Sequence, residues 1–243
     1  MRRGRTVIVR GGGDLATGII YRLWKTGFSV LVLESPRPLA VRRTVSAASA
    51  VFDGFTKVED MCVALIDSVE KFDAASGLVQ VLVDPDGKAI EKIKPGILID
   101  AIMAKKNTGT TKDMAPLVIA IGPGFTTPQD VHAVIETKRG HTLGRVITEG
   151  GAIPNTGVPG IIKGFGTERL LRAPADGYLF PVRGIGDEVS RGEVVGYVDG
   201  VEVCAGLDGI LRGLIHPSVH VTRGLKIGDV DPRGDPSHCW SIT

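Results

Sequence analysis

The sequence predicts an α/β fold in two parts, an open sheet with crossover helices followed by an all-β module. In the first part, short apolar runs of strand length alternate with segments of helical period, which is typical of a largely parallel sheet. From about Ala173 onward the chain has short β runs, many glycines and no segment of helical period. We therefore expect one domain at residues 1–165 and a second at residues 170–243.

A glycine-rich turn joins the first expected strand to the first expected helix. Residues 11–18, GGGDLATG, follow a strand predicted at Thr6–Arg10 and begin a helix predicted at Leu15–Thr26, which Gly27 ends. Strand, glycine turn and helix in this order bring backbone N–H groups and the positive end of the helix dipole to one place. The arrangement predicts an anion-binding site.

The spacing within the turn resembles the fingerprint of Rossmann-like dinucleotide-binding domains. Gly11, Gly13 and Ala16 fit G-x-G-x-x-A, and Glu34 ends the next apolar run. In that pattern the first glycine permits a tight turn, the second lets a phosphate approach the backbone, and the acid accepts a hydrogen bond from a ribose hydroxyl. The alternative is a tight turn in an α/β sheet that binds no ligand.

Further strands extend the predicted sheet, and the carboxyl ends of such strands border the ligand crevice of an open α/β sheet. They are expected at Ser29–Leu33, Val79–Val83, Ile97–Ile102 and Leu117–Ile121, followed by an antiparallel pair at Val131–Thr137 and Leu143–Thr148.

The candidate cofactor-binding residues lie in the turn and just after two of these strands. They are Gly11, Gly12, Gly13, Asp14, Glu34, Arg37, Arg42, Arg43, Asp100 and Lys105. We expect the glycines to receive phosphates and the arginines to neutralise the remaining charge, because a guanidinium offers paired donors to phosphate oxygens. For the arginines, a solvated basic loop is an equally good interpretation.

His132, Glu136 and His141 are candidates for a metal site, with a groove lined by polar residues as the alternative. The first two share one face of an expected strand, but no fourth ligand is evident, so the sequence favours the groove and predicts no metal. Cys239 beside His238 is a further, weaker candidate, a thiolate pair near the C-terminus. No complete hydrolase or kinase motif is present, and the catalytic residues stay unknown.

Composition narrows the class of protein. A net charge of +2 argues against steering of the whole protein to nucleic acid, and no apolar run reaches the length of a membrane helix. The three cysteines are scattered without a C-x-x-C pair, as in a cytoplasmic protein with reduced thiols. We expect a soluble cytoplasmic protein that binds neither nucleic acid nor membrane, with a homodimer as the default assembly.

The second half contains an internal repeat. Asp176–Leu179 matches Asp208–Leu211, and Val189–Gly192 matches Val221–Gly224, so two β units are expected to pack on each other as a pseudo-twofold sandwich. The pattern resembles the biotinyl/lipoyl barrel-sandwich hybrid. In carrier members of that family a lysine on the central hairpin holds the cofactor, but Asp199–Val203 contains no lysine. We expect a rigid module for packing or docking.

Several longer segments together resemble one family, the accessory proteins of selenium-dependent molybdenum hydroxylase systems, related to xanthine dehydrogenase maturation factors. The segments are VIVRGGGDLATGIIYRLWKTGFSVLVLESPRPLAVRRTVS, DAIMAKKN, IAIGPGFTTPQDVHAVIETKRGHTLGRVI and LRGLIHPSVHVTRGLKIGDVDPRG. The resemblance implies a role in maturing a client molybdenum hydroxylase, by handling the molybdenum cofactor or its selenium or sulfur ligand.

The leading functional prediction combines the turn with this resemblance. It is a maturation factor, non-catalytic rather than an enzyme, that binds molybdopterin dinucleotide or a related anionic, dinucleotide-like molecule at the glycine turn. The alternative is an NAD(P)-dependent oxidoreductase that uses the same turn, with Glu34 favouring NAD and the following arginines suiting a 2′-phosphate. A third interpretation is a scaffold in which the turn is only structural.

Overall fold

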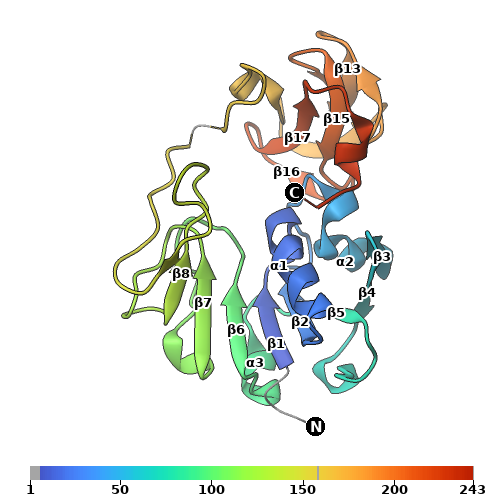
Figure 1. Cartoon of the computed structure of the whole chain (residues 1–243). Helices are drawn as coiled ribbons and strands as arrows, with labels where there is room; N and C mark the ends of the chain where they lie inside the picture. The colour runs from blue at the N-terminus through green and yellow to red at the C-terminus, as the bar shows by residue number, and fades with distance from the viewer. Residues whose placement is uncertain (1–5, 158, 243) are drawn as a thin grey trace.

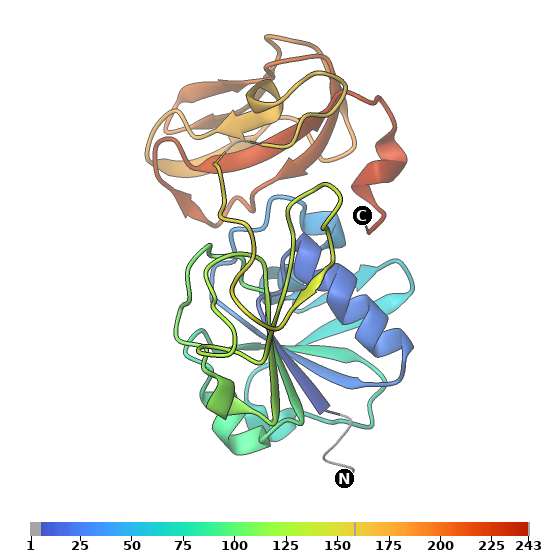
Figure 2. The ribbon, with the colours of Figure 1, turned by 60° about the vertical axis from the view of Figure 1, so that its left-hand side comes forward.

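The computed structural model describes residues 6–157 and 159–242, which form two halves joined by an extended segment (Figures 1 and 2). The N-terminal half is a nine-stranded mixed sheet, and the C-terminal half consists of two four-stranded sheets. The strands of the first sheet are β1 (Thr6–Arg10), β2 (Ser29–Glu34), β3 (Phe55–Val58), β4 (Met61–Ile66), β5 (Val79–Val83), β6 (Ile97–Asp100), β7 (Leu117–Ile121), β8 (Ala133–Ile135) and β9 (Val146–Ile147).

The helices of the N-terminal half are few and short. They are α1 (Asp14–Lys25), α2 (Ala50–Asp53) and α3 (Lys88–Ile93). In the described part of the chain, no helix has both the length and the apolar character needed to cross a bilayer.

The order of the first sheet is β3-β4-β5-β2-β1-β6-β7-β8-β9. β1 is central and pairs in parallel with β2 on one side and β6 on the other. The chain therefore leaves β1 toward one side of the sheet and later returns to its other side. This reversal is a topological switch point, at which the loops beyond the strands diverge and leave a crevice.

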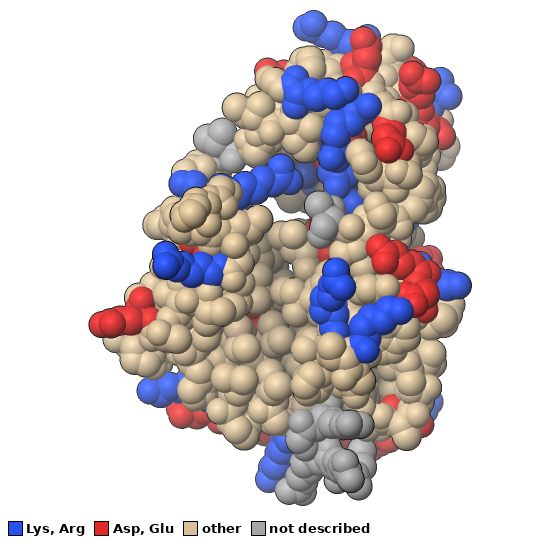
Figure 3. Space-filling model, viewed as in Figure 1, with Lys and Arg blue, Asp and Glu red and all other residues tan. Residues whose placement is uncertain are grey.

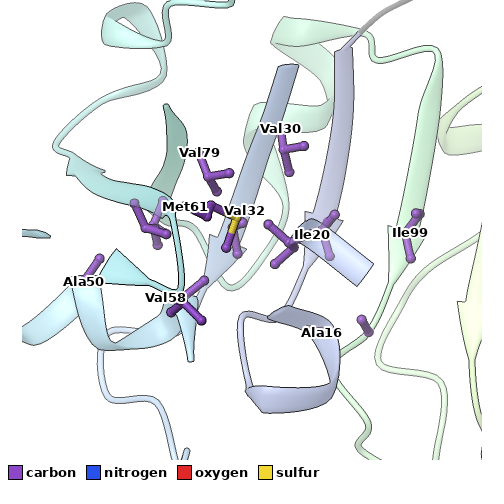
Figure 4. Close-up of a cluster of buried hydrophobic side chains, with 14 of the residues drawn as sticks. Ala16, Ile20, Val30, Val32, Ala50, Val58, Met61, Val79 and Ile99 are labelled. Carbon is purple, nitrogen blue, oxygen red and sulfur yellow. The ribbon is translucent and has the colours of Figure 1, made fainter. Parts of the chain in front are cut away.

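Burial explains why the central strand reads as an unbroken apolar run. Val7, Ile8 and Val9 are completely buried, as expected of a parallel strand with both faces covered. One face of β1 and β2 is covered by α1, whose Ala16 and Ile20 lie in the same cluster of buried side chains as residues of β2 (Figure 4).

The predicted Rossmann-like class was wrong for the N-terminal half. Its sheet is mixed, because β3 pairs antiparallel with β4 at one edge and β8 pairs antiparallel with β9 at the other. Among the described residues α1, with 12 residues, is the only helix of more than six, so the crossovers from β4 to β5, from β6 to β7 and from β7 to β8 contain no α-helix. The apolar runs predicted the strands but not the connections between them.

The C-terminal half follows the internal repeat. Its strands are β10 (Leu170–Arg172), β11 (Gly177–Pro181), β12 (Glu188–Val189), β13 (Val194–Val198), β14 (Val201–Cys204), β15 (Gly209–Leu214), β16 (His220–Val221) and β17 (Lys226–Asp231). The sheet orders are β10-β17-β15-β12 and β14-β13-β11-β16, so each repeat gives two strands to one sheet and one strand to the other.

The predicted biotinyl/lipoyl-like type of this half was wrong as well. The repeats form an open two-sheet sandwich, in which β10 and β14, which lie outside the matching strands, extend the two sheets at their edges. The turn at Asp199 and Gly200 joins β13 to β14 of the same sheet, and no lysine is there.

The two halves contact each other through the segment that follows β2. The Leu214 N–H donates to the Val41 carbonyl (2.8 Å), and Arg43 Nε donates to the Leu214 carbonyl (2.7 Å). The rings of Phe52 and His216 stack with their centroids 4.0 Å apart. These contacts place the C-terminal sandwich over the carboxyl ends of the central strands, as the direction of the strands in Figure 1 shows.

Two buried carboxylates stabilise the sandwich through arginines. Asp229 is paired with Arg169 through both carboxylate oxygens, at 2.8 and 3.0 Å, and both side chains are buried. Asp231 is fully buried and accepts hydrogen bonds from Arg233 Nε at 2.9 and 3.1 Å. Removing one partner of such a pair leaves an uncompensated charge, which is strongly destabilising.

Replacing Asp231 by Asn tests this pair through its pH dependence. Burial alone would raise the pKa of Asp231, but the hydrogen bonds from Arg233 outweigh it and lower the pKa from its ordinary 3.8 to about 2. Because the folded-state value is the lower one, the ionised carboxylate stabilises the fold above about pH 4. This contribution, about 2 kcal/mol, is lost as the pH falls toward 2. Denaturant unfolding should show a flatter acid limb for D231N than for the wild type; identical limbs would contradict the pairing.

Candidate functional site

The first two glycines of the turn are required by close backbone packing. Gly11 has φ +89°, and a Cβ there would lie 2.9 Å from the Ala101 carbonyl oxygen in the loop after β6. A Cβ on Gly12 would lie 2.9 Å from the Ala48 nitrogen, whose N–H donates to the Gly12 carbonyl at 2.8 Å. At these two positions the neighbouring backbone leaves no room for a side chain, so no ligand is needed to explain the glycines.

Gly13 differs from its neighbours because packing does not require it. Its φ of −64° and ψ of 177° suit any residue, and no atom lies within 4 Å of a Cβ built there. Gly13 is the N-cap of α1, a position at which Ser, Thr, Asp or Asn usually bonds the first turn, and α1 has no side-chain cap. The N–H groups of residues 13–16 donate to no acceptor among the described residues.

A cavity of about 520 Å3 lies over this helix end, and we call it the turn cavity. Its lining comes from the turn, the segment after β2 and the loop after β6: Gly11, Gly13, Asp14, Leu15, Ala16, Glu34, Ser35, Pro38, Leu39, Ala40, Val41, Ala101, Ile102, Met103 and Ala104. These segments meet at the switch point of the sheet. The lining combines free N–H groups with apolar side chains, among them the exposed Leu15 and Leu39.

The two acids of the turn cavity have partners. Glu34 accepts from the Gly12 N–H through Oε2 and from the Ser35 N–H through Oε1, each at 2.7 Å. Asp14 Oδ2 lies 3.3 Å from Arg42 Nη1. Their negative charge is therefore compensated in part by groups of the protein. Glu34 supports the turn and keeps lone pairs that can accept from a ligand hydroxyl.

The three predicted arginines do not gather around the turn cavity. Arg42 is buried, and its Nη2 donates to the carbonyls of His238 and Ser241 at 3.1 Å each. Arg43 bonds the C-terminal sandwich, and burial lowers its pKa. Arg37 is exposed and does not line the cavity. Arg42 and Arg43 thus hold the two halves together.

Asp100 and Lys105, which follow β6, are separated in the structure. Asp100 is buried; its Oδ2 accepts from the Thr110 hydroxyl at 2.6 Å and its Oδ1 from the Ile102 N–H at 3.2 Å. It shapes the loop from β6 and does not line the turn cavity. Lys105 is exposed, has φ +63°, and lies at a second cavity.

The second cavity, which we call the basic cavity, has a volume of about 340 Å3. Its lining is Met103, Lys105, Pro123, Thr137, Lys138, Arg139, Ile153, Pro154, Asn155, Thr156 and Gly160. Met103 lines both cavities, so they are neighbours along the carboxyl edge of the sheet. Sequence reasoning missed Lys138 and Arg139, although they directly follow an expected strand.

The three residues weighed as metal ligands do not form a cluster. His132 Nδ1 accepts from the Val118 N–H at 3.0 Å, whereas buried Glu136 accepts from the N–H groups of Lys138 and Ile153. His141 lies in a separate surface depression. Within residues 6–157 and 159–242 there is no group of three or more His, Cys, Asp or Glu side chains suited to hold a metal.

A larger cavity of about 1150 Å3 lies elsewhere, beside α3. Its lining extends from Asp86 and Gly87, which follow β5, to Gly96 and Pro116, which precede β6 and β7, so it is not confined to one edge of the sheet. Its charged residues are mixed, with Lys88, Lys94 and Lys112 beside Asp86, Glu91 and Asp113.

Among curated proteins, the chain is similar to the "Uncharacterized protein YqeB" of Escherichia coli (strain K12), with 46% identity over 239 residues. The alignment covers 98% of this chain and 44% of YqeB, so this chain spans less than half the length of that relative. No protein-family model matches the chain.

Solved structures show only a distant likeness. They include an aspartoacylase family protein from Mesorhizobium loti (12% identity, TM-score 0.30) and a succinylglutamate desuccinylase/aspartoacylase from Rhodobacter sphaeroides (14%, 0.29). A third is the ectoine utilization protein EutE (DoeB) from Ruegeria pomeroyi (13%, 0.27). Each alignment covers 93% of this chain and 85% of the other. Scores of this size transfer no activity to this chain.

These comparisons correct the predicted family and function. The solved structures carry aspartoacylase, desuccinylase or ectoine utilization names and YqeB is uncharacterized, so none of them is named as an accessory protein of a molybdenum hydroxylase. Membership of that family was wrong, and with it the role as a selenium-linked maturation factor. The alternative, an NAD(P)-dependent oxidoreductase, was wrong too, since none of these proteins is named as one.

Alanine at two adjacent glycines tests the geometry of the turn. Gly12→Ala should lower the free energy of unfolding by about 1–3 kcal/mol, because its Cβ meets the backbone of Ala48. Gly13→Ala should change it by no more than about 0.5 kcal/mol, because its Cβ enters open space. Denaturant unfolding measures both. Equal losses at the two positions would contradict the packing described here.

Proposed function

We propose that this protein binds a phosphorylated small molecule in the turn cavity, with a phosphate on the free N–H groups at the start of α1. The observation that carries the proposal is Gly13. Packing does not require a glycine at this N-cap, and a glycine has no side chain to bond the N–H groups of the first turn of α1. These N–H groups lie directly at the turn cavity. Backbone N–H groups and the helix dipole together favour an anion at such a helix end.

The position in the fold supports the same proposal. The turn cavity lies beyond the carboxyl ends of β1 and β6. The strands that follow β1 in the chain lie on one side of it and β6 lies on the other, so this is the switch point of the sheet. Ligands of open α/β sheets bind at this kind of place. The C-terminal sandwich contacts this edge through Val41 and Arg43, and Val41 also lines the turn cavity.

The lining supports a ligand with an apolar or flat portion beside its phosphate. Leu15, Leu39 and Met103 provide apolar surface next to the helix end. The two acids of the cavity oppose an anion less than their formal charge suggests, because Arg42 lies against Asp14 and two backbone N–H groups bond Glu34. An anionic, dinucleotide-like molecule, the class of partner expected from the sequence, meets these requirements.

Several expectations from the sequence stay predictions. Molybdopterin dinucleotide and NAD(P) are two candidate ligands of the proposed class, and a cytoplasmic location and a homodimer are likewise expectations from composition. The turn cavity contains no nucleophile paired with a base, so the proposal is one of binding and assigns no reaction.

Gly13→Asp tests the proposed site without disturbing the fold. The new carboxylate can cap α1, so the unfolding temperature should stay equal to that of the wild type or rise. The same carboxylate occupies the free N–H groups and repels phosphate. The affinity for pyrophosphate and for ADP, measured by isothermal titration calorimetry, should therefore fall at least about tenfold.

Gly13→Asn is the matched control, because asparagine has the same shape and caps helices equally well but carries no charge. Its loss of affinity should be smaller than that of Gly13→Asp. The proposal fails if the wild type binds neither pyrophosphate nor ADP, or if Gly13→Asp binds them as tightly as the wild type does.

A further inference from the structure

We infer that the basic cavity is a second anion-binding site, and that it receives the far end of the same phosphorylated ligand. The ligand class is then an elongated molecule with anionic groups at both ends, such as a linear polyphosphate or a polyphosphorylated nucleotide. The inference rests on the proposed function for the ligand's other end, but its own support comes from different residues.

The first support is charge. Lys105, Lys138 and Arg139 line the basic cavity, and no Asp or Glu is among its lining residues. No ion pair joins these three cations to an acid in the described part of the chain. On the face seen in Figure 3, Lys and Arg side chains also gather around the hollow between the two halves. Three cations in one cavity, without an ion-pair partner among the described residues, favour an anionic occupant.

The second support is that hydrogen bonds to a buried carboxylate hold two lining segments of the basic cavity in place. Buried Glu136 accepts from the Lys138 N–H at 2.7 Å through one oxygen and from the Ile153 N–H at 2.8 Å through the other. Burial raises the pKa of Glu136, but these backbone N–H groups outweigh it and lower the pKa below its ordinary value. The ionised carboxylate therefore connects the segment with the two cations to the opposite wall.

Neutral hydrogen-bonding groups complete the lining. The Thr137 hydroxyl and the Asn155 amide lie beside the cations, and Lys105 Nζ lies 3.2 Å from the Asn155 amide oxygen in the orientation that satisfies both groups. The Arg139 guanidinium approaches Gly160, where a Cβ would be 3.3 Å from Nη1. Cations beside hydroxyl and amide groups suit the several oxygens of a phosphate.

The third support is the relation to the turn cavity. β6 and β7 lie between β1 and β8, and neighbouring strands are about 4.8 Å apart. The ends of β1 and β8, from which the two cavities begin, are therefore about 14 Å apart along one edge of the sheet. Met103 lines both cavities, so the two are neighbours, and the inferred ligand has to extend past this side chain to occupy both. Pyrophosphate is too short to reach both.

The test compares pyrophosphate with hexapolyphosphate, which differ in length but not in chemistry. The variant K138Q/R139Q removes two cations of the basic cavity, and both side chains are exposed, so the fold should persist. Calorimetry should show at least about a tenfold loss of affinity for hexapolyphosphate, because charge-assisted hydrogen bonds are lost. The affinity for pyrophosphate at the turn cavity, which is the affinity that Gly13→Asp lowers, should stay that of the wild type.

The control R191Q/R223Q removes the same net charge from exposed turns of the C-terminal sandwich. It should leave both affinities unchanged. An equal loss of hexapolyphosphate binding in this control would overturn the inference, since it would show attraction by net charge alone.

Gly13→Asp separates this inference from the proposed function. If Gly13→Asp weakens pyrophosphate binding but K138Q/R139Q weakens neither ligand, the second site is overturned and the turn cavity stands. If K138Q/R139Q weakens hexapolyphosphate binding but Gly13→Asp changes nothing, the basic cavity binds anions by itself and the shared ligand is overturned. A wild type that binds neither probe overturns both.

Discussion

The candidate site depends on close backbone packing at the carboxyl end of β1. The turn is held on three sides: the Gly11 N–H donates to the Leu33 carbonyl, the Gly12 N–H donates to Glu34, and the Gly12 carbonyl accepts from Ala48. Side chains at Gly11 or Gly12 would collide with backbone atoms. This packing fixes the start of α1 in one position, and only Gly13 is left facing open space.

The C-terminal sandwich extends this arrangement by covering the same edge of the sheet. Arg42 connects the first residue of α1 to the carbonyls of His238 and Ser241, and Arg43 bonds the Leu214 carbonyl. Two basic residues that could have contacted a ligand are thus used to join the halves. The free cations lie farther along the edge, in the basic cavity, where β8 ends and the chain turns toward the sandwich.

The strands and the turn could be predicted because their causes are local. Runs such as Val7–Val9 are apolar throughout since both faces of the strand are buried, and the strand predicted at Thr6–Arg10 is confirmed. The helix predicted at Leu15–Thr26 is confirmed to within one residue at each end, as α1. The connections could not be predicted this way: the loops from β6 and β7 form no α-helix, and the Rossmann-like class failed there.

The site was predicted less completely, since side-chain partners depend on tertiary contacts. Nothing local in the sequence shows that Asp100 bonds Thr110 or that Arg42 bonds the C-terminal segment. The basic cavity could have been predicted by the rule that also selected Asp100 and Lys105, namely that residues following a parallel strand border the ligand crevice. Lys138 and Arg139 meet this rule at the end of β8. The sequence predicted this strand only as one half of an antiparallel pair, which it forms with β9, and assigned no ligand to its end.

The most direct test of the central claim is to locate an oxyanion in crystals of the wild-type protein soaked in tungstate, whose anomalous scattering marks its position. The account predicts density within hydrogen-bonding distance of the Gly13 and Asp14 N–H groups, inside the turn cavity. Crystals in which tungstate binds elsewhere, while the turn cavity contains only water, would contradict it.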